Sequence, residues 1–102
     1  TIRGDGEQRR DFTHVRDIAR ANIMAMHSDK VGNGEVINVG NCDNRSVNQV
    51  ADMIGGPTVN VDPVVEPRET LADNSKAKNL LGWSPSVVIE EWVQKYKKDL
   101  GI

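Results

Sequence analysis

The sequence predicts a mixed α/β fold, α+β-like, of about four helices joined by short strands. Two observations predict it: apolar residues recur at helical spacing in four stretches, and two short β-branched runs lie between turn residues. A length of 102 residues fits one modest domain, which should bury roughly 60 to 65 % of the surface that its unfolded chain exposes. No internal repeat or low-complexity segment interrupts the pattern.

The first predicted helix covers residues 15–28 and follows an extended step over residues 11–15. Its apolar side chains lie nearly all round the helix axis: Val15, Ile18, Ala19, Ala21, Ile23, Met24, Ala25 and Met26. An amphipathic surface helix would show a single apolar stripe. We therefore expect this helix to lie between two packed surfaces.

Caps and apolar stripes delimit the other three helices. Ser46 and Gln49 form a capping box before a helix that ends at a Gly-Gly pair, and residues 75–81 form a third helix that stops at a glycine. The last helix, over residues 89–100, is expected to pack its apolar stripe in the core and to expose a charged, solvated face. The stripe consists of Ile89, Trp92, Val93, Tyr96 and Leu100.

Two segments are predicted to be strands. Residues 35–40 form a β-branched run with glycine turns on both sides, and residues 58–61 form a shorter run that ends before Pro63. The 35–40 run suits a buried strand. A strand in that position needs neighbours to pair with.

Composition and charge restrict the classes of partner. The 13 basic and 15 acidic side chains give a net charge of −2, which argues against nucleic acid or an anionic membrane as the main partner. The longest mainly apolar run, residues 18–26, is too short to span a bilayer. The single cysteine, Cys42, cannot form an internal disulfide and lies in a polar turn without a second thiol, so a reduced, cytoplasmic setting is expected. Because the chain begins with Thr1 rather than Met, we expect it to be a piece of a longer one.

Three features look like functional sites but are better explained otherwise. His14 and His27 have no Cys or carboxylate at ligand spacing, so no metal site is predicted. The Gly-Asn-Gly turn at residues 32–34 begins like a dinucleotide fingerprint, but the third glycine is missing and the turn precedes a strand. Tyr96 falls on the stripe of the last helix, where a core role is expected rather than catalysis.

Arg10 is the strongest candidate for binding chemistry. It follows a glycine turn on an extended segment just before a helix, where a guanidinium can present its N–H fork to phosphate oxygens. Arg68, in the later Glu-Pro-Arg-Glu loop, is a second such group. In the alternative, each arginine only pairs with a neighbouring acid such as Asp11 or Glu69, and local chemistry does not decide between these two interpretations. The sequence places no nucleophile beside a base, so it does not indicate a complete active site.

Four ordered segments, which form three motifs, carry a family resemblance. Residues 4–21 read GDGEQRRDFTHVRDIARA and resemble the GDGxQxRDFxxVxDxxxA stretch of the extended short-chain dehydrogenases/reductases, the nucleotide-sugar epimerases and dehydratases typified by UDP-glucose 4-epimerase. Residues 36–40, VINVG, and residues 46–54, SVNQVADMI, are similar to that family's FNVG strand and the helix after it. Residues 66–85, EPRETLADNSKAKNLLGWSP, resemble its ExRxTxADxSKAxxLLGWxP segment.

The resemblance implies that residues 1–102 are the C-terminal, nucleotide-sugar-binding portion of such an enzyme, without its NAD-binding Rossmann domain. NAD would then be the cofactor of the parent enzyme, and a nucleotide-diphosphate sugar would be the partner of this portion. The resemblance also implies that Arg10 contacts the diphosphate and that Phe12 lies near the bound nucleotide. Further candidates match the substrate loop, the loop that closes over the nucleotide and the end of the predicted strand: Gln8, Glu66, Arg68 and Asn38.

Two positions depart from the family pattern. Residues 63–65 replace the Arg-Pro-Gly of many relatives, so a second phosphate-binding arginine is lacking there. Val88 replaces a serine that often caps the last helix, which should weaken that helix by about 1 kcal/mol.

The sequence thus predicts the substrate-binding part of an NAD-dependent nucleotide-sugar epimerase or dehydratase, inactive by itself. Two alternatives stay open: a stand-alone nucleotide-binding or protein-interaction module, and a fragment of a nucleotide-sugar reductase. An uncovered helix face and strand edge further predict a homo-oligomer, or packing against the missing Rossmann domain.

Overall fold

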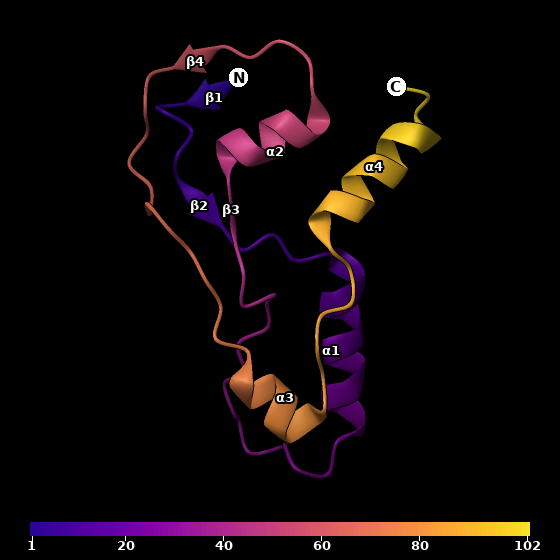
Figure 1. Cartoon of the computed structure of the whole chain (residues 1–102). Coiled ribbons are helices and arrows are strands. Elements are labelled where there is room, and N and C mark those ends of the chain that lie inside the picture. Colours follow the sequence, from indigo (N-terminus) through magenta and orange to yellow (C-terminus); the bar gives the residue numbers. More distant parts are fainter.

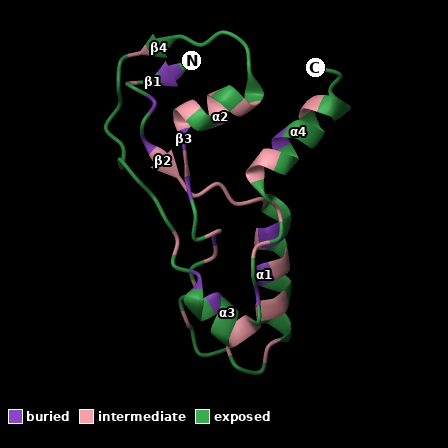
Figure 2. Ribbon diagram, in the orientation of Figure 1, coloured by how far each residue is buried: buried purple, intermediate pink, exposed green.

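The chain forms a thin, elongated molecule in a computed structural model that describes residues 1–102 (Figure 1). It measures 49 × 35 × 15 Å, and its radius of gyration of 16.3 Å exceeds the value of about 13 Å expected for a compact domain of this length. Its accessible surface is 7046 Å², so it buries about 57 % of the surface of an unfolded chain, slightly less than predicted. Figure 2 shows how few residues are buried.

Four helices and four two-residue strands confirm the predicted fold class. At one end of the molecule α1 and α3 lie side by side, and at the other end α2 faces α4 next to the paired strands (Figure 1). None of the helices combines the length and the apolar character that crossing a membrane requires. In chain order the elements are β1 (Ile2–Arg3), β2 (Arg9–Arg10), α1 (Val15–His27), β3 (Arg45–Ser46), α2 (Val47–Ile54), β4 (Asn60–Val61), α3 (Ser75–Leu81) and α4 (Ile89–Asp99).

The strands bring distant parts of the chain together. β1 pairs in parallel with β4, and β2 pairs antiparallel with β3, with Arg9 opposite Ser46. The 66–72 loop runs along the other side of β2: Arg9 N donates to Arg68 O at 2.9 Å, and Thr70 N donates to Arg9 O at 3.0 Å. β2, which carries Arg10, therefore lies between β3 and the 66–72 loop.

The helices α2, α3 and α4 begin or end at the capping positions that the sequence predicts. Ser46 Oγ accepts from Gln49 N and Gln49 Oε1 accepts from Ser46 N, so the predicted capping box of α2 is confirmed. Gly82 ends α3 in the left-handed conformation, with φ of 67°. Val88, at the N-cap of α4, offers no side-chain hydrogen bond, as expected from its apolar side chain.

The small core lies between α1 and α3. Ala21, Ala77 and Trp83 are its fully buried members, and four partly buried side chains pack against them: Met24, Ile37, Val39 and Leu81. The Trp83 indole N–H donates to the backbone oxygen of Asp17 at 2.9 Å. This bond ties the segment after α3 to α1.

Asp17 places a carboxylate inside this region, with its side chain only 1 % exposed. Three donors of the segment after α3 bind it: Ser86 N at 3.0 Å, Ser86 Oγ at 2.8 Å and Val87 N at 3.1 Å. Arg20 pairs with it at 3.0 Å and lies over the Trp83 ring. Burial alone would raise the pKa of Asp17, but these hydrogen bonds outweigh burial and lower the pKa to about 2.

The prediction of a strand over residues 35–40 is wrong. No backbone group in this segment bonds to another backbone group, because no second strand of the chain lies alongside it. Its side chains still alternate: Ile37 and Val39 pack on the core, whereas Val36 is 78 % exposed. Side chains of the α3 region take up two of its carbonyl groups, with Lys76 donating to Val36 O and Asn74 donating to Gly40 O.

Only one of the two surfaces expected to cover α1 is present. Its inner face packs on the core through Ala21 and Met24. On its outer face Val15 and Met26 are 74 % and 72 % exposed, and Ile23 is also exposed. The apolar outer face of α1 therefore has no partner within the chain.

The predicted burial of the α4 stripe is also wrong, apart from Val93. Tyr96 is 49 % exposed and stacks on Trp92, with 4.8 Å between the ring centroids. The reason is that α2 and residues 12–15 cover α4 incompletely, which leaves an open apolar groove of about 540 Å³ between α2 and α4. We refer to it as the α2–α4 groove; Val50, Ile54, Trp92 and Tyr96 contribute to its lining.

Candidate functional site

Three of the six predicted site residues meet where β2 faces the 66–72 loop. Glu66 Oε1 accepts from Gln8 Nε2 at 2.9 Å, and Glu66 Oε2 pairs with Arg10 Nη2 at 3.3 Å. Gln8 is buried and also donates to Arg3 O at 3.0 Å, so its side chain is fixed on both sides. The glycine turn and the loop, 58 residues apart in sequence, thus build one polar cluster of Gln8, Arg10 and Glu66.

Arg10 presents a guanidinium at the surface of this cluster. Its side chain is 25 % exposed, and Nη1 donates to Arg9 O at 2.7 Å. Its Nε has no protein acceptor. Arg10 is therefore oriented by its own strand and by Glu66 while it keeps N–H groups for an incoming anion, the arrangement that suits a phosphate.

Arg68 is engaged elsewhere. Its Nη1 and Nη2 donate to the two carboxylate oxygens of Asp5 at 2.9 and 3.0 Å, a fork-to-fork pair on the exposed surface. Hydrogen bonds from Arg68, and next from the Glu7 N–H, lower the pKa of Asp5 to about 2. The same pairing raises the pKa of Arg68. Asp5 thus engages both terminal nitrogens of Arg68.

Both arginines are thus paired with acids, but not with the acids that the sequence suggested. Asp11 is not available to them, because backbone N–H groups and a hydroxyl occupy its carboxylate. Glu69 is turned away as well, since its Oε1 accepts from Asn44 Nδ2 at 2.8 Å. The pairings follow the tertiary fold rather than proximity in sequence.

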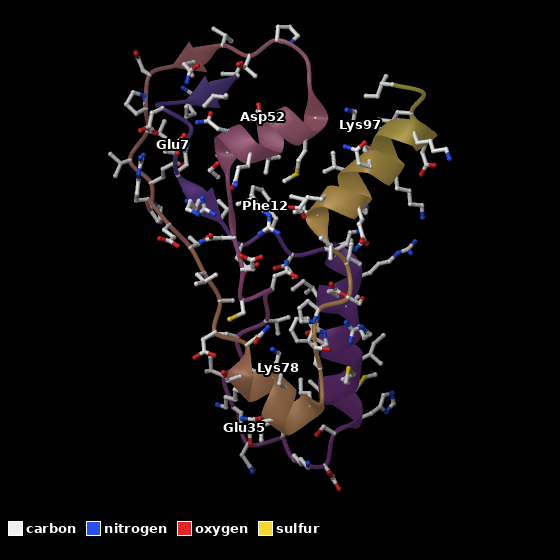
Figure 3. All side chains as sticks on the ribbon, viewed as in Figure 1. Glu7, Phe12, Glu35, Asp52, Lys78 and Lys97 are labelled. Carbon is white, nitrogen blue, oxygen red and sulfur yellow. The ribbon has the colours of Figure 1, made fainter.

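Phe12 and Asn38 lie outside the cluster. Phe12 is partly buried and lines both the α2–α4 groove and a polar cavity of about 240 Å³ beside residues 41–45. Figure 3 shows it near the centre of the molecule. The other five predicted residues line neither cavity. Asn38 is exposed on the 35–40 segment and shares none of the hydrogen bonds of the cluster.

Sequence reasoning missed two carboxylates that tie separate parts of the chain together, Asp11 next to the cluster and Asp17 in the core at a distance from it. Asp11 accepts hydrogen bonds from two separate loops, and Asp17 joins α1 to the segment before α4. The signal for Asp17 was its spacing: it lies four and seven residues before Ala21 and Met24, on the face of α1 that packs in the core. A carboxylate on an apolar face needs several donors. For Asp11, the only sequence feature that pointed to such a role was its position between Arg10 and Phe12.

The residues present do not fit a bound NAD. The N–H groups of Gly32 and Asn33 both donate to Glu35 Oε2 at 2.9 Å, which lowers the pKa of Glu35. The turn is therefore closed by its own carboxylate and leads into no helix that could receive a pyrophosphate. Figure 3 shows Glu35 beside α3, far from Phe12. No group of three or more His, Cys, Asp or Glu side chains is arranged to hold a metal ion.

Comparison with known proteins gives a consistent family. The family model described as GDP-mannose 4,6 dehydratase matches residues 1–96. The UDP-glucose 4-epimerase of Corynebacterium glutamicum is 36 % identical over 88 residues, which cover 79 % of this chain and 27 % of that protein. The UDP-glucuronate 4-epimerase of Thermodesulfobacterium geofontis is 37 % identical over 102 residues, which cover 92 % of this chain and 31 % of that protein.

Solved structures agree. The crystal structure of UDP-glucuronic acid 4-epimerase from Bacillus cereus, in complex with UDP-glucuronic acid and NAD, matches with a TM-score of 0.84 at 37 % identity and covers 97 % of this chain and 35 % of that chain. The chain thus spans about a third of the length of its relatives. The family resemblance of the sequence motifs is confirmed: the chain belongs to the GDP-mannose 4,6-dehydratase family, within the NAD-dependent nucleotide-sugar epimerases and dehydratases.

Proposed function

We propose that this chain supplies the nucleotide-sugar-binding residues of an NAD-dependent nucleotide-sugar epimerase or dehydratase. The observation that carries the proposal is the cluster of Gln8, Arg10 and Glu66, in which an arginine is held at the surface with N–H groups free for an anion. Relatives solved with UDP-sugars and NAD support the substrate class and the cofactor. NAD is the cofactor of the whole enzyme and is held by its other portion.

In this proposal Arg10 binds the diphosphate and Phe12 flanks the nucleotide. Glu66 pairs with Arg10 in the ligand-free chain, so a phosphate competes with a carboxylate for the same fork. Gln8 keeps Glu66 within the cluster during this exchange. The contribution of the chain to the reaction is positioning: it fixes the substrate so that the sugar is presented in one orientation. Arg68 is a second phosphate contact once it leaves Asp5, and Asn38 a peripheral one.

Calorimetric titration with UDP-, GDP- and dTDP-sugars tests the site. We expect Arg10→Ala to weaken the preferred ligand about tenfold or more, because a charge-assisted hydrogen bond is lost. Arg10→Lys should recover only part of the affinity, because it keeps the charge but loses the fork. Arg16→Ala is the matched control, since Arg16 is exposed on α1 outside the cluster. Equal affinities of Arg10→Ala and the wild type would remove Arg10 from the site.

Activity gives a second test. The purified 102-residue chain, supplied with UDP-glucose and NAD, should form no epimerised or dehydrated product, because its residues do not fit NAD. Product formation that depends on NAD would contradict this part of the proposal.

We also propose that the outer face of α1 and the unpaired 35–40 segment contact the NAD-binding portion of the whole enzyme. The exposure of Val15, Ile23 and Met26, together with backbone groups that lack partners, supports a covering surface. In the isolated chain a second copy would cover the same face. Sedimentation should therefore show self-association that Ile23→Lys reduces and Lys95→Ala, on the charged face of α4, does not. A wild-type chain that stays monomeric would contradict the homo-oligomer.

A further inference from the structure

We propose that Asp11 is a positioning residue of the nucleotide-phosphate site, although it touches no ligand itself. The proposal rests on the function proposed above. Asp11 lies between Arg10 and Phe12, and its carboxylate forms no ion pair with any Lys, Arg or His. Its role is therefore to hold backbone rather than to balance the charge of Arg10, which Glu66 already does.

Four donors converge on the Asp11 carboxylate. Oδ1 accepts from Asn41 N at 3.0 Å and from Thr13 Oγ1 at 3.2 Å. Oδ2 accepts from Cys42 N at 3.1 Å and from Ala72 N at 3.2 Å. One side chain thus fastens the segment of Arg10 and Phe12 to the 40–42 turn and to the end of the 66–72 loop, which carries Glu66.

The surroundings leave this carboxylate little room to move. Gly40 is buried, and a Cβ there would touch the side chain of Ala72 and come within 2.9 Å of Asp11 Oδ2. Cys42 adopts a φ of 59°, a conformation that non-glycine residues seldom adopt and that its hydrogen bond to Asp11 helps to hold. The Asp11 N–H in turn donates to Thr70 Oγ1 at 3.3 Å.

The same contacts reach the two flanking site residues. The Asn41 side chain donates to the backbone oxygen of Phe12, so the turn bound by Asp11 also holds Phe12. On the other side, Thr70 N donates to Arg9 O, the oxygen that also accepts from Arg10 Nη1. A loosened Asp11 would therefore release both the backbone of Phe12 and the anchor of the Arg10 guanidinium.

Asp11→Asn tests the inference, because the amide keeps the shape but offers only one oxygen and turns an NH₂ group toward N–H donors. We expect the variant to bind UDP about tenfold more weakly than the wild type. We also expect its ligand-free NMR spectrum to show a displaced Arg10 Nε–Hε signal. Asp17→Asn is the matched control: it removes an equally bonded carboxylate, at a distance from the cluster. It should lower the stability but leave both the UDP affinity and the Arg10 signal unchanged.

Thr13→Val keeps the test decisive if Asp11→Asn does not fold, because it removes only one of the four donors. It should weaken UDP binding about threefold. UDP affinity within experimental error of wild type, with an unmoved Arg10 signal, in whichever of these variants folds, overturns the inference. A wild-type chain that binds none of UDP, GDP and dTDP overturns the proposed function instead, and the inference with it. This result is seen in the wild type, before any variant is made.

Discussion

Asp17 offers the sharpest test of how the fold is held together. Asp17→Asn keeps one oxygen for the Ser86 hydroxyl or for one N–H, and turns an NH₂ group toward the remaining donors. Each buried donor left without an acceptor costs about 1 to 3 kcal/mol. With Arg20 also losing its charged partner, we expect the free energy of unfolding to fall by about 3 kcal/mol near neutral pH.

The pKa of Asp17 gives this prediction an independent pH dependence. The folded pKa of about 2 lies below the ordinary value of 3.8, so the unfolded state binds more protons between these values. The stabilisation is complete above about pH 4 and disappears as the pH falls toward 2, and it amounts to about 2 kcal/mol. The difference between wild type and Asp17→Asn should therefore shrink from about 3 to about 1 kcal/mol on acidification.

Urea unfolding followed by tryptophan fluorescence measures both effects. Trp83 is fully buried beside Asp17, and a Trp92→Phe background removes the exposed second indole. Asp52→Asn, on the outer face of α2 (Figure 3), is the control and should stay within about 0.5 kcal/mol of wild type. The other carboxyl groups with lowered pKa values are present in both proteins, so their contributions to the pH dependence cancel in the difference between wild type and Asp17→Asn. An unchanged urea midpoint, or a difference that does not vary between pH 6 and pH 2, would refute the role given to Asp17.

Three further changes have defined outcomes. Gly40→Ala should destabilise the fold by about 1 to 3 kcal/mol in urea, because the added methyl group meets Ala72 and Asp11; a neutral result would show that the turn can shift. Val88→Ser should raise the free energy of unfolding by about 1 kcal/mol by capping α4, and no gain in melting temperature would exclude a cap there. Asp5→Asn should tighten UDP binding in calorimetry by freeing Arg68, whereas unchanged affinity would leave Arg68 out of the site.

Local sequence signals predicted the helices well because the determinants of each helix are local. The Ser46–Gln49 capping box and Gly82 each fix a helix end within one turn. The predicted strand over residues 35–40 failed for the opposite reason. Alternation shows which side chains face the core, such as Ile37, and which face solvent, such as Val36. A strand exists only if another strand supplies hydrogen bonds.

The members of the polar cluster were predictable from the sequence, but their pairings were not. The motifs singled out Gln8, Arg10 and Glu66, and the fold brings these three together. No local rule linked Arg68 to Asp5, because that contact depends on how β1 pairs with β4 and where the 66–72 loop runs. The exposure of Tyr96 escaped prediction for a similar reason: a stripe on a helix does not say how much surface lies opposite.

Titration of wild type and Arg10→Ala with UDP and with uridine is the most direct test of the claim that Arg10 binds phosphate. The two ligands share the nucleoside and differ in the diphosphate, so the comparison isolates the interaction between Arg10 and phosphate. We predict that Arg10→Ala weakens UDP binding by about tenfold or more and leaves uridine binding unchanged. Equal UDP affinities of the two proteins, or an equal loss for UDP and uridine, would contradict the claim.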